Sequence, residues 1–311
     1  MNPWLIVLVI AGSALLSTIV VHMSIRTSHH LAAYDHPDGE RKTQDRPIPK
    51  LGGVAVAFAL TASVVVVLLL TGRFEQLGLA LSVLFPALVA ALIGFLDDRQ
   101  ALTPYLRLAM QTGVAALAWA LGTRLNVTGN EAVDALIFVL WVLVLVNGIN
   151  LLDNSDGLAG ATVLVSSLGA AVIAVMYGQI LVSILGFAIA GVTVGFLWHN
   201  WFPAKVYMGD AGAYFLGFLL AILTVRLKPT EAPVLVGVVI AILLVLVPLF
   251  DTTFVVINRL RQGIHPFTAG RDHLSHALQG RQLSVAWSVA ALQLLGMVGV
   301  LIAITLAWTY R

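Results

Sequence analysis

Long apolar runs recur along almost the whole chain and decide what it can fold into. A bilayer-spanning helix needs about 20 mostly apolar residues, and about ten runs approach that length. They occupy residues 4–25, 51–71, 77–96, 105–122, 133–152, 159–177, 179–198, 211–227, 233–254 and 284–308. Only 10% of the 311 residues are charged, against about 25% in soluble domains. We therefore predict an all-α polytopic membrane protein with about ten transmembrane helices, built as one integral-membrane domain over residues 1–311.

The remaining composition narrows the possible functions. The chain has no cysteine, which excludes a disulfide framework and a thiolate zinc site. Its net charge of +2 does not indicate a nucleic-acid-binding surface. The first apolar run lacks both a basic segment before it and a small-residue cleavage site after it. We therefore expect a retained helix there and not a signal peptide.

Lysines and arginines in the connections predict the orientation, because cytoplasmic loops of membrane proteins are enriched in them. If the N-terminus lies outside, most of the 17 basic residues fall in inner connections. We therefore predict that both termini lie outside. The same orientation gathers the acidic and histidine motifs at the cytoplasmic face, where we predict the active site. These motifs contain Asp97, Asp98, Asp153, Asp156, Asp210, His273 and His276.

The polar segment 147–158 lies between two long apolar runs, where charge is costly. Asp153 and Asp156 are three residues apart and share a face if the backbone is helical, and Asn147 and Asn150 precede them. Carboxylate and amide oxygens suit Mg²⁺ or Mn²⁺. One interpretation is therefore a site for a metal and a substrate. The other is that Asp156 or a neighbouring polar side chain caps the next helix.

Asp97 and Asp98 end the third apolar run. Two anions at a helix C-terminus oppose the helix dipole, so they need a cation nearby. They could be a general base and its partner facing a metal-bound phosphate, or a solvated loop paired with Arg99. Asp210, at the start of the eighth run, could be a metal ligand or a helix N-cap. The segment 198–203 just before it could be an interfacial aromatic belt or a wall for base stacking.

The last inner connection carries His273 and His276, which could share a helical face. With Arg259, Arg261 and Arg271 they suggest a diphosphate clamp. The alternative is a basic loop that contacts anionic lipid, and a two-histidine zinc site lacks an obvious third ligand.

Cations also precede the second run. Arg41 and Lys42 could hold a lipid phosphate, although the positive-inside rule alone would place them there. For Asp251 we expect a structural role, with Arg259 as its candidate partner.

Taken in order, these motifs resemble the polyprenyl-phosphate N-acetylhexosamine-1-phosphate transferase superfamily, glycosyltransferase family 4, over nearly the whole chain. That group includes enzymes that start O-antigen and teichoic acid glycans, and the phospho-MurNAc-pentapeptide transferase. Each motif alone is weak, but the ordered set is highly specific. The matching segments are Asp35-His36-Pro37 with Arg41-Lys42, Pro47-Ile48-Pro49-Lys50-Leu51-Gly52-Gly53, Asp97-Asp98, Asn150-Leu151-Leu152-Asp153 with Asp156-Gly157-Leu158-Ala159, Met208-Gly209-Asp210-Ala211-Gly212, Pro248-Leu249-Phe250-Asp251 and His273-Leu274-Ser275-His276.

The resemblance implies a reaction, a cofactor and partners. A UDP-sugar would give its sugar-1-phosphate, GlcNAc-1-phosphate by preference, to undecaprenyl or another polyprenyl phosphate in the lipid bilayer, and UMP would leave. The resemblance also implies Mg²⁺ or Mn²⁺, a bacterial-type inner (plasma) membrane with the active site cytoplasmic, and allows a homodimer. The MurNAc-pentapeptide type is the alternative. A transporter would instead need charged or broken helices near the midplane, and four run centres carry no charge: 51–71, 133–152, 159–177 and 284–308.

The resemblance also implies residue roles. Asp97 would deprotonate or position the lipid phosphate, supported by Asp98. Asp210 would bind the metal, helped by Asn150. The candidate catalytic residues are Asp97, Asp98, Asp153, Asp156 and His273; the candidate substrate-binding residues are Arg41, Lys42, Asn147, Asn150, Arg271 and His276; the candidate metal ligands are Asp210 and Asn150.

The chain departs from the family pattern at two places. Many members have a histidine where this chain has Ser275. Many have a glycine and an aliphatic residue between the two aspartates, where this chain has Asn154 and Ser155. Neither departure removes the flanking carboxylates or histidines.

Overall fold

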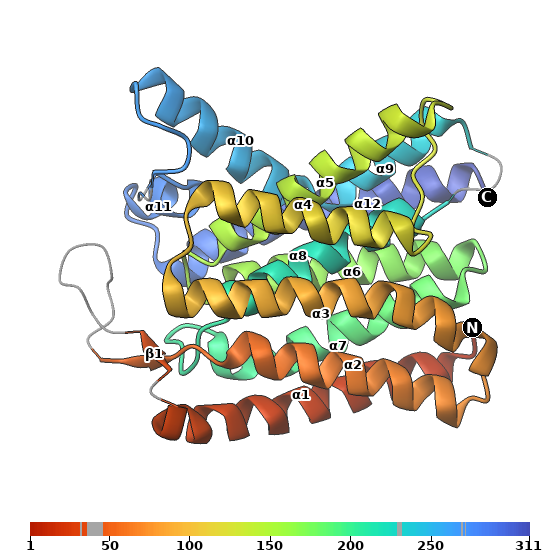
Figure 1. Cartoon of the computed structure of the whole chain (residues 1–311), viewed down its shortest axis with the longest axis horizontal. Helices are drawn as coiled ribbons and strands as arrows, with labels where there is room; N and C mark the ends of the chain where they lie inside the picture. Colours follow the sequence, from red (N-terminus) through yellow and green to blue (C-terminus); the bar gives the residue numbers. More distant parts are fainter. Residues whose placement is uncertain (32, 36–45, 229–231, 269, 271) are drawn as a thin grey trace.

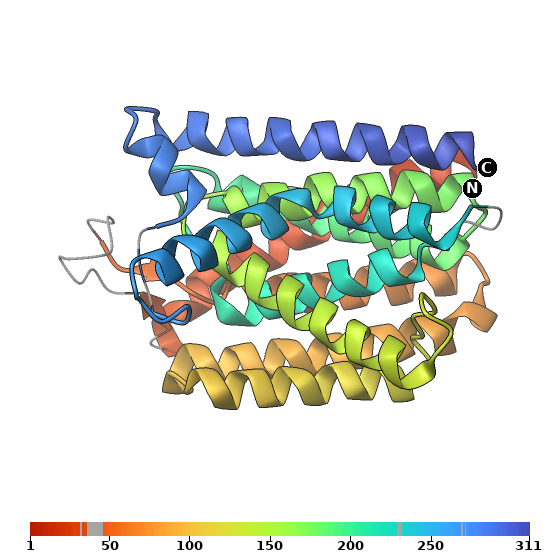
Figure 2. The same cartoon turned by 90° about the horizontal axis from the view of Figure 1, so that it is seen from above.

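The computed structural model describes the chain except residues 32, 36–45, 229–231, 269 and 271. The described chain is built from α-helices that run roughly side by side (Figures 1 and 2). The first six are α1 (Pro3–Leu31), α2 (Gly52–Leu70), α3 (Leu77–Gln100), α4 (Pro104–Ala120), α5 (Glu131–Leu152) and α6 (Leu158–Met176). The rest are α7 (Ile180–Asn200), α8 (Gly209–Arg226), α9 (Val234–Leu244), α10 (Leu246–Arg261), α11 (Leu274–Gln279) and α12 (Val285–Thr309).

Eight helices in the described part of the chain are long and apolar enough to cross a membrane, or nine if the bent pair α9 and α10 is one span. The all-α prediction is therefore confirmed at that level. α4 has 17 residues, the lower limit for a spanning helix of about 17–25 residues, and is not among those eight. The remaining regular structure in the described chain is one short 3₁₀ turn, Phe74–Gln76, and a strand pair, β1 (Tyr34–Asp35) antiparallel to β2 (Ile48–Pro49).

The run predicted at 233–254 is not one straight helix. It breaks at Val245, and α10 leaves α9 at an angle of 76° before continuing to Arg261. Pro248 contributes to the break, because it lacks an N–H and its ring clashes with the carbonyl four residues earlier. That carbonyl belongs to Leu244, the last residue of α9.

The termini and the polar motifs lie at opposite ends of the bundle. Both termini are marked at one end, while β1, α11 and the end of α10 lie at the other (Figures 1 and 2). The chain crosses the bundle repeatedly between these ends, so the end of α3 and the start of α8 meet far from the termini. α7 and α8 supply much of the buried core. All the described candidate site residues lie on elements that start or finish at the end opposite the termini.

Candidate functional site

The end of α3 packs directly against the start of α8. Gly94 makes this possible, because a Cβ there would collide with the backbone of Asp210. Oδ2 of Asp98 then accepts a hydrogen bond from the Ala211 N–H at 3.2 Å. An unpaired N–H at a helix N-terminus is a natural partner for a carboxylate. The positive end of α8 therefore offsets the unfavourable position of Asp98 at the end of α3.

Asp97 is buried, and both of its carboxylate oxygens accept hydrogen bonds. Its Oδ1 accepts from the Leu102 N–H at 2.9 Å, and its Oδ2 accepts from the Tyr214 hydroxyl at 2.6 Å and from Arg107 at 3.4 Å. The alternative of a solvated loop paired with Arg99 is wrong for Asp97. Arg99 instead lies over the ring of Phe95, 5.0 Å from its centre. Tyr214 and Arg107 were missing from the sequence-based site, because nothing in their local pattern separates them from structural residues.

Asn150 and Asp210 join α5 to α8. The Asn150 side-chain amide donates to Oδ1 of Asp210. Asp210 lies in the first turn of α8, whose N-cap is Met208, so the N-cap interpretation of Asp210 is wrong. Asn147, one turn earlier, is directed elsewhere: its amide donates to Gln111 Oε1 at 2.7 Å and to the Leu143 carbonyl at 2.8 Å. The predicted grouping of these two asparagines with the carboxylates therefore holds for Asn150 alone.

Asp153 follows α5 and completes a group of carboxylates. Burial, and then the negative charges of Asp210 and Asp98, raise the pKa of Asp153 well above its usual range, partly opposed by a hydrogen bond from the Gly209 N–H. Gly209 has φ of +66°, and a Cβ there would press on the Asp98 carboxylate. The three aspartates are thus close enough to repel one another.

Residues 153–157 connect α5 to α6 and are called the acidic loop below. Asp156 ties this loop to the segment before α8. Its Oδ2 accepts from the Ala204 N–H at 2.8 Å, and burial raises its pKa above the usual value. Buried Asn200 adds a second tie, because its Oδ1 accepts from the Gly157 N–H at 3.1 Å and its amide donates to the Val206 carbonyl at 2.8 Å. The N-cap of α6 is Gly157, without a side-chain cap, so the interpretation of Asp156 as a cap is wrong.

Two aromatic side chains of the 198–203 segment lie in different surroundings. Trp198 is 78% exposed, as an interfacial residue would be. The Trp201 ring instead lies against Gly157, where an added Cβ would come within 3.1 Å of it. Trp201 therefore borders the acidic loop.

Lys50 is a cation of this region that the sequence-based site omitted. Its Nζ lies 2.9 Å from Oδ1 of Asp35. Burial opposes its charge, but the hydrogen bond and charge of Asp35, followed by the charges of Asp98 and Asp210, raise the pKa of Lys50 above its usual value. The segment after Lys50 also contacts the segment before Asp210 through the backbone. The Gly53 N–H donates to the Met208 carbonyl at 3.0 Å.

The donor set suits a hard cation that also binds phosphate. Among the described residues, no three His, Cys, Asp or Glu side chains are arranged to hold a metal by themselves. Mg²⁺ does not need such a cage, because it is usually bound by one or two carboxylates plus water and substrate phosphates. Asp210, held by Asn150, lies among carboxylates whose mutual repulsion a cation would relieve. The residues therefore fit Mg²⁺ bound together with a phosphorylated substrate.

The histidine segment is anchored to α10. Buried Asp251 accepts from His273 Nδ1 at 2.9 Å and from the Leu274 N–H at 2.8 Å. The expected pairing of Asp251 with Arg259 is therefore wrong. The rings of His273 and His276 lie 6.0 Å apart. His276 lies within the short helix α11, whereas His273 is its extended N-cap residue, so the two rings are neighbours without both belonging to the helix.

Arg259 is 4% exposed and holds Asp272. Its Nε and one terminal nitrogen donate to the two carboxylate oxygens at 2.7 and 2.8 Å, and the other terminal nitrogen donates to the Pro266 carbonyl at 2.6 Å. These bonds lower the pKa of Asp272 below its usual value. Arg259 cannot also serve in a diphosphate clamp. Three other predicted substrate-binding residues, Arg41, Lys42 and Arg271, lie outside the described residues.

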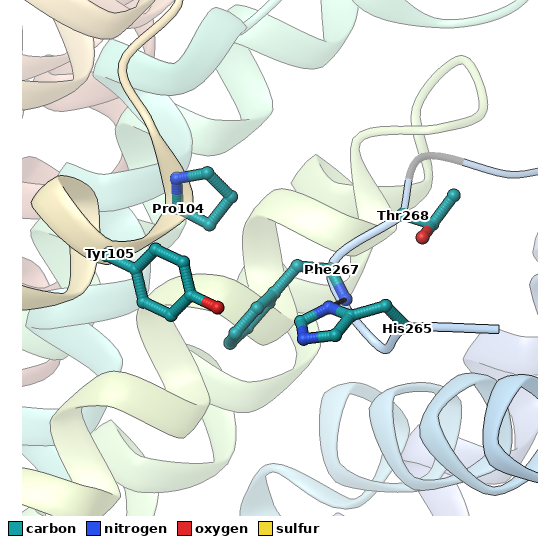
Figure 3. Close-up of a pocket in the computed structure, with 5 residues that line it drawn as sticks. All are labelled: Pro104, Tyr105, His265, Phe267 and Thr268. Atoms are coloured by element: carbon teal, nitrogen blue, oxygen red, sulfur yellow. Dashed lines mark hydrogen bonds between the residues drawn. The ribbon is translucent and has the colours of Figure 1, made fainter.

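Two hollows of about 260 Å³ lie near the same end of the bundle. The first is between the start of α4 and the segment after α10, where Tyr105 and Phe267 point toward each other beside His265 (Figure 3). The second hollow lies along α10 and is lined by Phe250, Thr253, Phe254, Ile257, Asn258 and Arg261. Both combine aromatic or aliphatic walls with a few polar groups.

Comparison with known proteins assigns the family. The model of the family described as glycosyl transferase family 4 matches residues 80–228. A Bacillus subtilis protein named probable undecaprenyl-phosphate N-acetylglucosaminyl 1-phosphate transferase is 30% identical over 97% of this chain and 85% of its own length.

Two further relatives cover less of the chain. A Mycolicibacterium smegmatis decaprenyl-phosphate N-acetylglucosaminephosphotransferase is 28% identical over 77% of this chain and 67% of its own length. A Streptococcus mutans phospho-N-acetylmuramoyl-pentapeptide-transferase is 34% identical over 66% of each chain. The match to the Bacillus protein runs through the α3, α5, α8 and α11 motifs that meet at one end of the bundle. This chain belongs to glycosyl transferase family 4, within the polyprenyl-phosphate hexosamine-1-phosphate transferase superfamily.

Proposed function

We propose that this protein transfers GlcNAc-1-phosphate from UDP-GlcNAc to a polyprenyl phosphate such as undecaprenyl phosphate. The products are polyprenyl-diphosphate-GlcNAc and UMP, and the reaction would start a cell-envelope glycan. The observation that carries the proposal is the group formed by Asp98, Asn150, Asp153 and Asp210 at the junction of α3, α5 and α8. The near-complete match to the Bacillus subtilis relative supports this choice of substrates.

In the proposed reaction an oxygen of the lipid phosphate attacks the sugar-linked phosphorus of the donor. The bond from that phosphorus to the oxygen of the uridine-linked phosphate breaks, and UMP leaves with that oxygen. A proton carried by the lipid phosphate must be accepted as the new bond forms. Asp98 is better suited to accept it than Asp97, because both oxygens of Asp97 are already engaged by Leu102, Tyr214 and Arg107.

The transfer requires positioning and neutralisation of phosphate charge more than covalent chemistry from the protein. Asp210 and Asn150 would hold Mg²⁺, or Mn²⁺ in its place, which when bound offsets the charge of the diphosphate. Lys50 adds a fixed positive charge beside Asp98 and Asp210. His273, which is held by Asp251, and the nearby His276 would contact the sugar-phosphate end of the donor.

The acceptor would approach from the membrane. The hollow along α10 has aromatic and aliphatic walls beside polar side chains, Arg261 among them. That lining suits a polyprenyl chain with a phosphate at its end. The basic residues of the described connections support a cytoplasmic position for this end of the bundle, with both termini outside.

The test is release of UMP by purified protein in detergent with undecaprenyl phosphate and Mg²⁺. UDP-GlcNAc, UDP-GalNAc and UDP-MurNAc-pentapeptide are supplied separately, and Asp98→Asn and Asp210→Asn serve as matched inactive controls. Turnover with UDP-GlcNAc alone supports the proposal. Turnover with UDP-MurNAc-pentapeptide alone would favour the second candidate function, a phospho-MurNAc-pentapeptide transferase, which the names of the Streptococcus relatives suggest. Folded protein that releases UMP from none of the donors would refute both.

A further inference from the structure

The positions where the chain departs from the family pattern touch one another. The Ser275 hydroxyl on α11 donates to Oδ1 of Asn154 in the acidic loop at 2.7 Å. The two residues are 121 positions apart in the chain, so only the tertiary fold brings them together. Ser275 is fully buried, and its hydroxyl therefore cannot exchange this partner for water.

Both polar groups of the Asn154 side chain form hydrogen bonds close to its contact with Ser275, which we call the junction. Its amide donates to the Leu151 carbonyl at 2.6 Å, and its Oδ1 also accepts from the Ser155 hydroxyl at 2.9 Å. A second contact lies one turn further along α11, where the Gln279 amide donates to Ser155 Oγ at 3.5 Å. Ser275 and Gln279 are four residues apart, so they lie on the same face of α11. That face is docked on the loop.

The residues on either side of the junction belong to the site. Asn154 lies directly after Asp153 and two positions before Asp156, while Ser275 lies between His273 and His276. Asp251 fixes the start of α11 to α10 but makes no described bond to the acidic loop. The bonds of Ser275 and Gln279 link α11 directly to that loop.

We propose that Asn154 and Ser275 form a latch that sets the histidines of α11 against the aspartates of the acidic loop. Both are positioning residues for the transfer and do not bind the substrate themselves. The pair also explains the two departures as one exchange. A large side chain at 154 with a small one at 275 fills the space that a small residue at 154 and a histidine at 275 would share. The inference relies on the proposed transfer reaction for its kinetic test.

The kinetic test is a double-mutant cycle. Ser275→Ala and Asn154→Ala each remove the same bond, so each should lower kcat about 10-fold, within the range that lost positioning produces. The double variant should be no slower than the slower single variant. The KM for polyprenyl phosphate should not change, and the loss of kcat should persist at temperatures well below the unfolding transition of each variant. Ser28→Ala, which removes a buried hydroxyl that donates to the Ser24 carbonyl within α1, is the control and should keep most of the activity. Additive losses, or losses that follow the unfolding temperature, would refute the latch.

A second kinetic test places the larger side chain at position 275 and the smaller one at position 154. Ser275→His alone should inactivate the enzyme, because the buried site of Ser275 has no room for an imidazole beside Asn154. Adding Asn154→Gly should restore activity. A double variant as inactive as Ser275→His would contradict the exchange.

A cross-link tests the latch without activity. The chain has no cysteine, so Asn154→Cys with Ser275→Cys creates a single possible disulfide. Mild oxidation should form it, as read by mass spectrometry of the linked peptides. The control pairs Asn154→Cys with Ala277→Cys, because Ala277 is two positions away and does not share the docked face. Equal cross-linking of both pairs would refute the latch. A cross-link specific to the first pair, in a protein that releases UMP from no donor, would refute the proposed function and leave the latch standing.

Discussion

The side-chain amide of Asn150 donates to Oδ1 of Asp210, and this bond joins the end of α5 to the first turn of α8. It restrains the rotamer of the carboxylate. A ligand held by a hydrogen-bonded neighbour binds metal more tightly than a free one. We therefore expect Asn150 to support binding of the proposed cation by Asp210.

Asn150→Ala should raise the Mg²⁺ concentration needed for half-maximal activity by about 10-fold, because loss of such a supporting bond costs about 10- to 100-fold in metal affinity. UMP release measured across a magnesium titration, after treatment with a chelator, is the readout. Asn147→Ala is the matched control from the same helix, since its amide donates to Gln111 and Leu143 and not to Asp210. An equal shift in both variants would contradict a specific role for Asn150.

Asp98→Asn and Asp97→Asn should differ in kind. The first should lower kcat by about 10²- to 10⁴-fold, as loss of a general base does, with little change in the unfolding temperature. The second should lower the unfolding temperature, because a buried carboxylate that accepts from Tyr214, Arg107 and Leu102 is replaced by an amide. Steady-state rates and thermal unfolding in detergent separate the two effects. The reverse pattern would make Asp97 the base.

Gly94→Ala should separate α3 from α8 and abolish activity, because its new Cβ would overlap the Asp210 backbone. Gly113→Ala in α4 is the matched control, since no atom lies within 4 Å of the added Cβ. Alanine is preferred over glycine in helices by about 0.5–1 kcal/mol, so the control should be fully active and slightly more stable. Rates and unfolding temperatures of both variants check the prediction. An active Gly94→Ala enzyme would show that the contact is not needed.

The pair of Arg259 and Asp272 should make stability depend on pH in acid. The pKa of Asp272 is lowered in the folded protein, so its contribution is fully present above the unfolded value near 3.9 and is lost as pH falls through the folded value. Asp272→Asn should therefore destabilise the protein by about 2 kcal/mol at pH 7, as loss of a charged hydrogen bond does. The difference from the unmodified protein should shrink below about pH 4. Unfolding in detergent from pH 3 to 7 measures both. A constant difference over that range would exclude the ion pair as its cause.

The sequence was sufficient to place most helices, because each apolar run is bounded by polar residues and a bilayer imposes a minimum length. It did not predict the break at Val245. Proline alone is not a reliable signal in such helices: Pro86 lies inside α3 without interrupting it, while Pro248 coincides with a 76° bend. Packing against neighbouring helices decides between these outcomes.

The gathering of Asp98, Asp153 and Asp210 at one end was predictable, since orientation follows from charge and helices start and finish at fixed ends. The partners of the individual groups were not. Asp251 could reach Arg259 or His273, and the choice depends on how the six residues of α11 dock. The outward turn of Asn147 toward Gln111 likewise depends on a neighbouring helix and not on spacing along its own.

The bend between α9 and α10 bears on how a lipid-linked acceptor reaches the enzyme. The hollow on the α10 side of the bend is bordered by exposed Phe250, Phe254 and Ile257. We therefore expect the proposed polyprenyl acceptor to reach it from the bilayer, by diffusion in two dimensions. The rate should then follow the mole fraction of acceptor among the surrounding lipids. Diluting the whole suspension with buffer that holds UDP-GlcNAc and Mg²⁺ constant would leave turnover per enzyme unchanged, whereas diluting the acceptor with inert lipid would slow it.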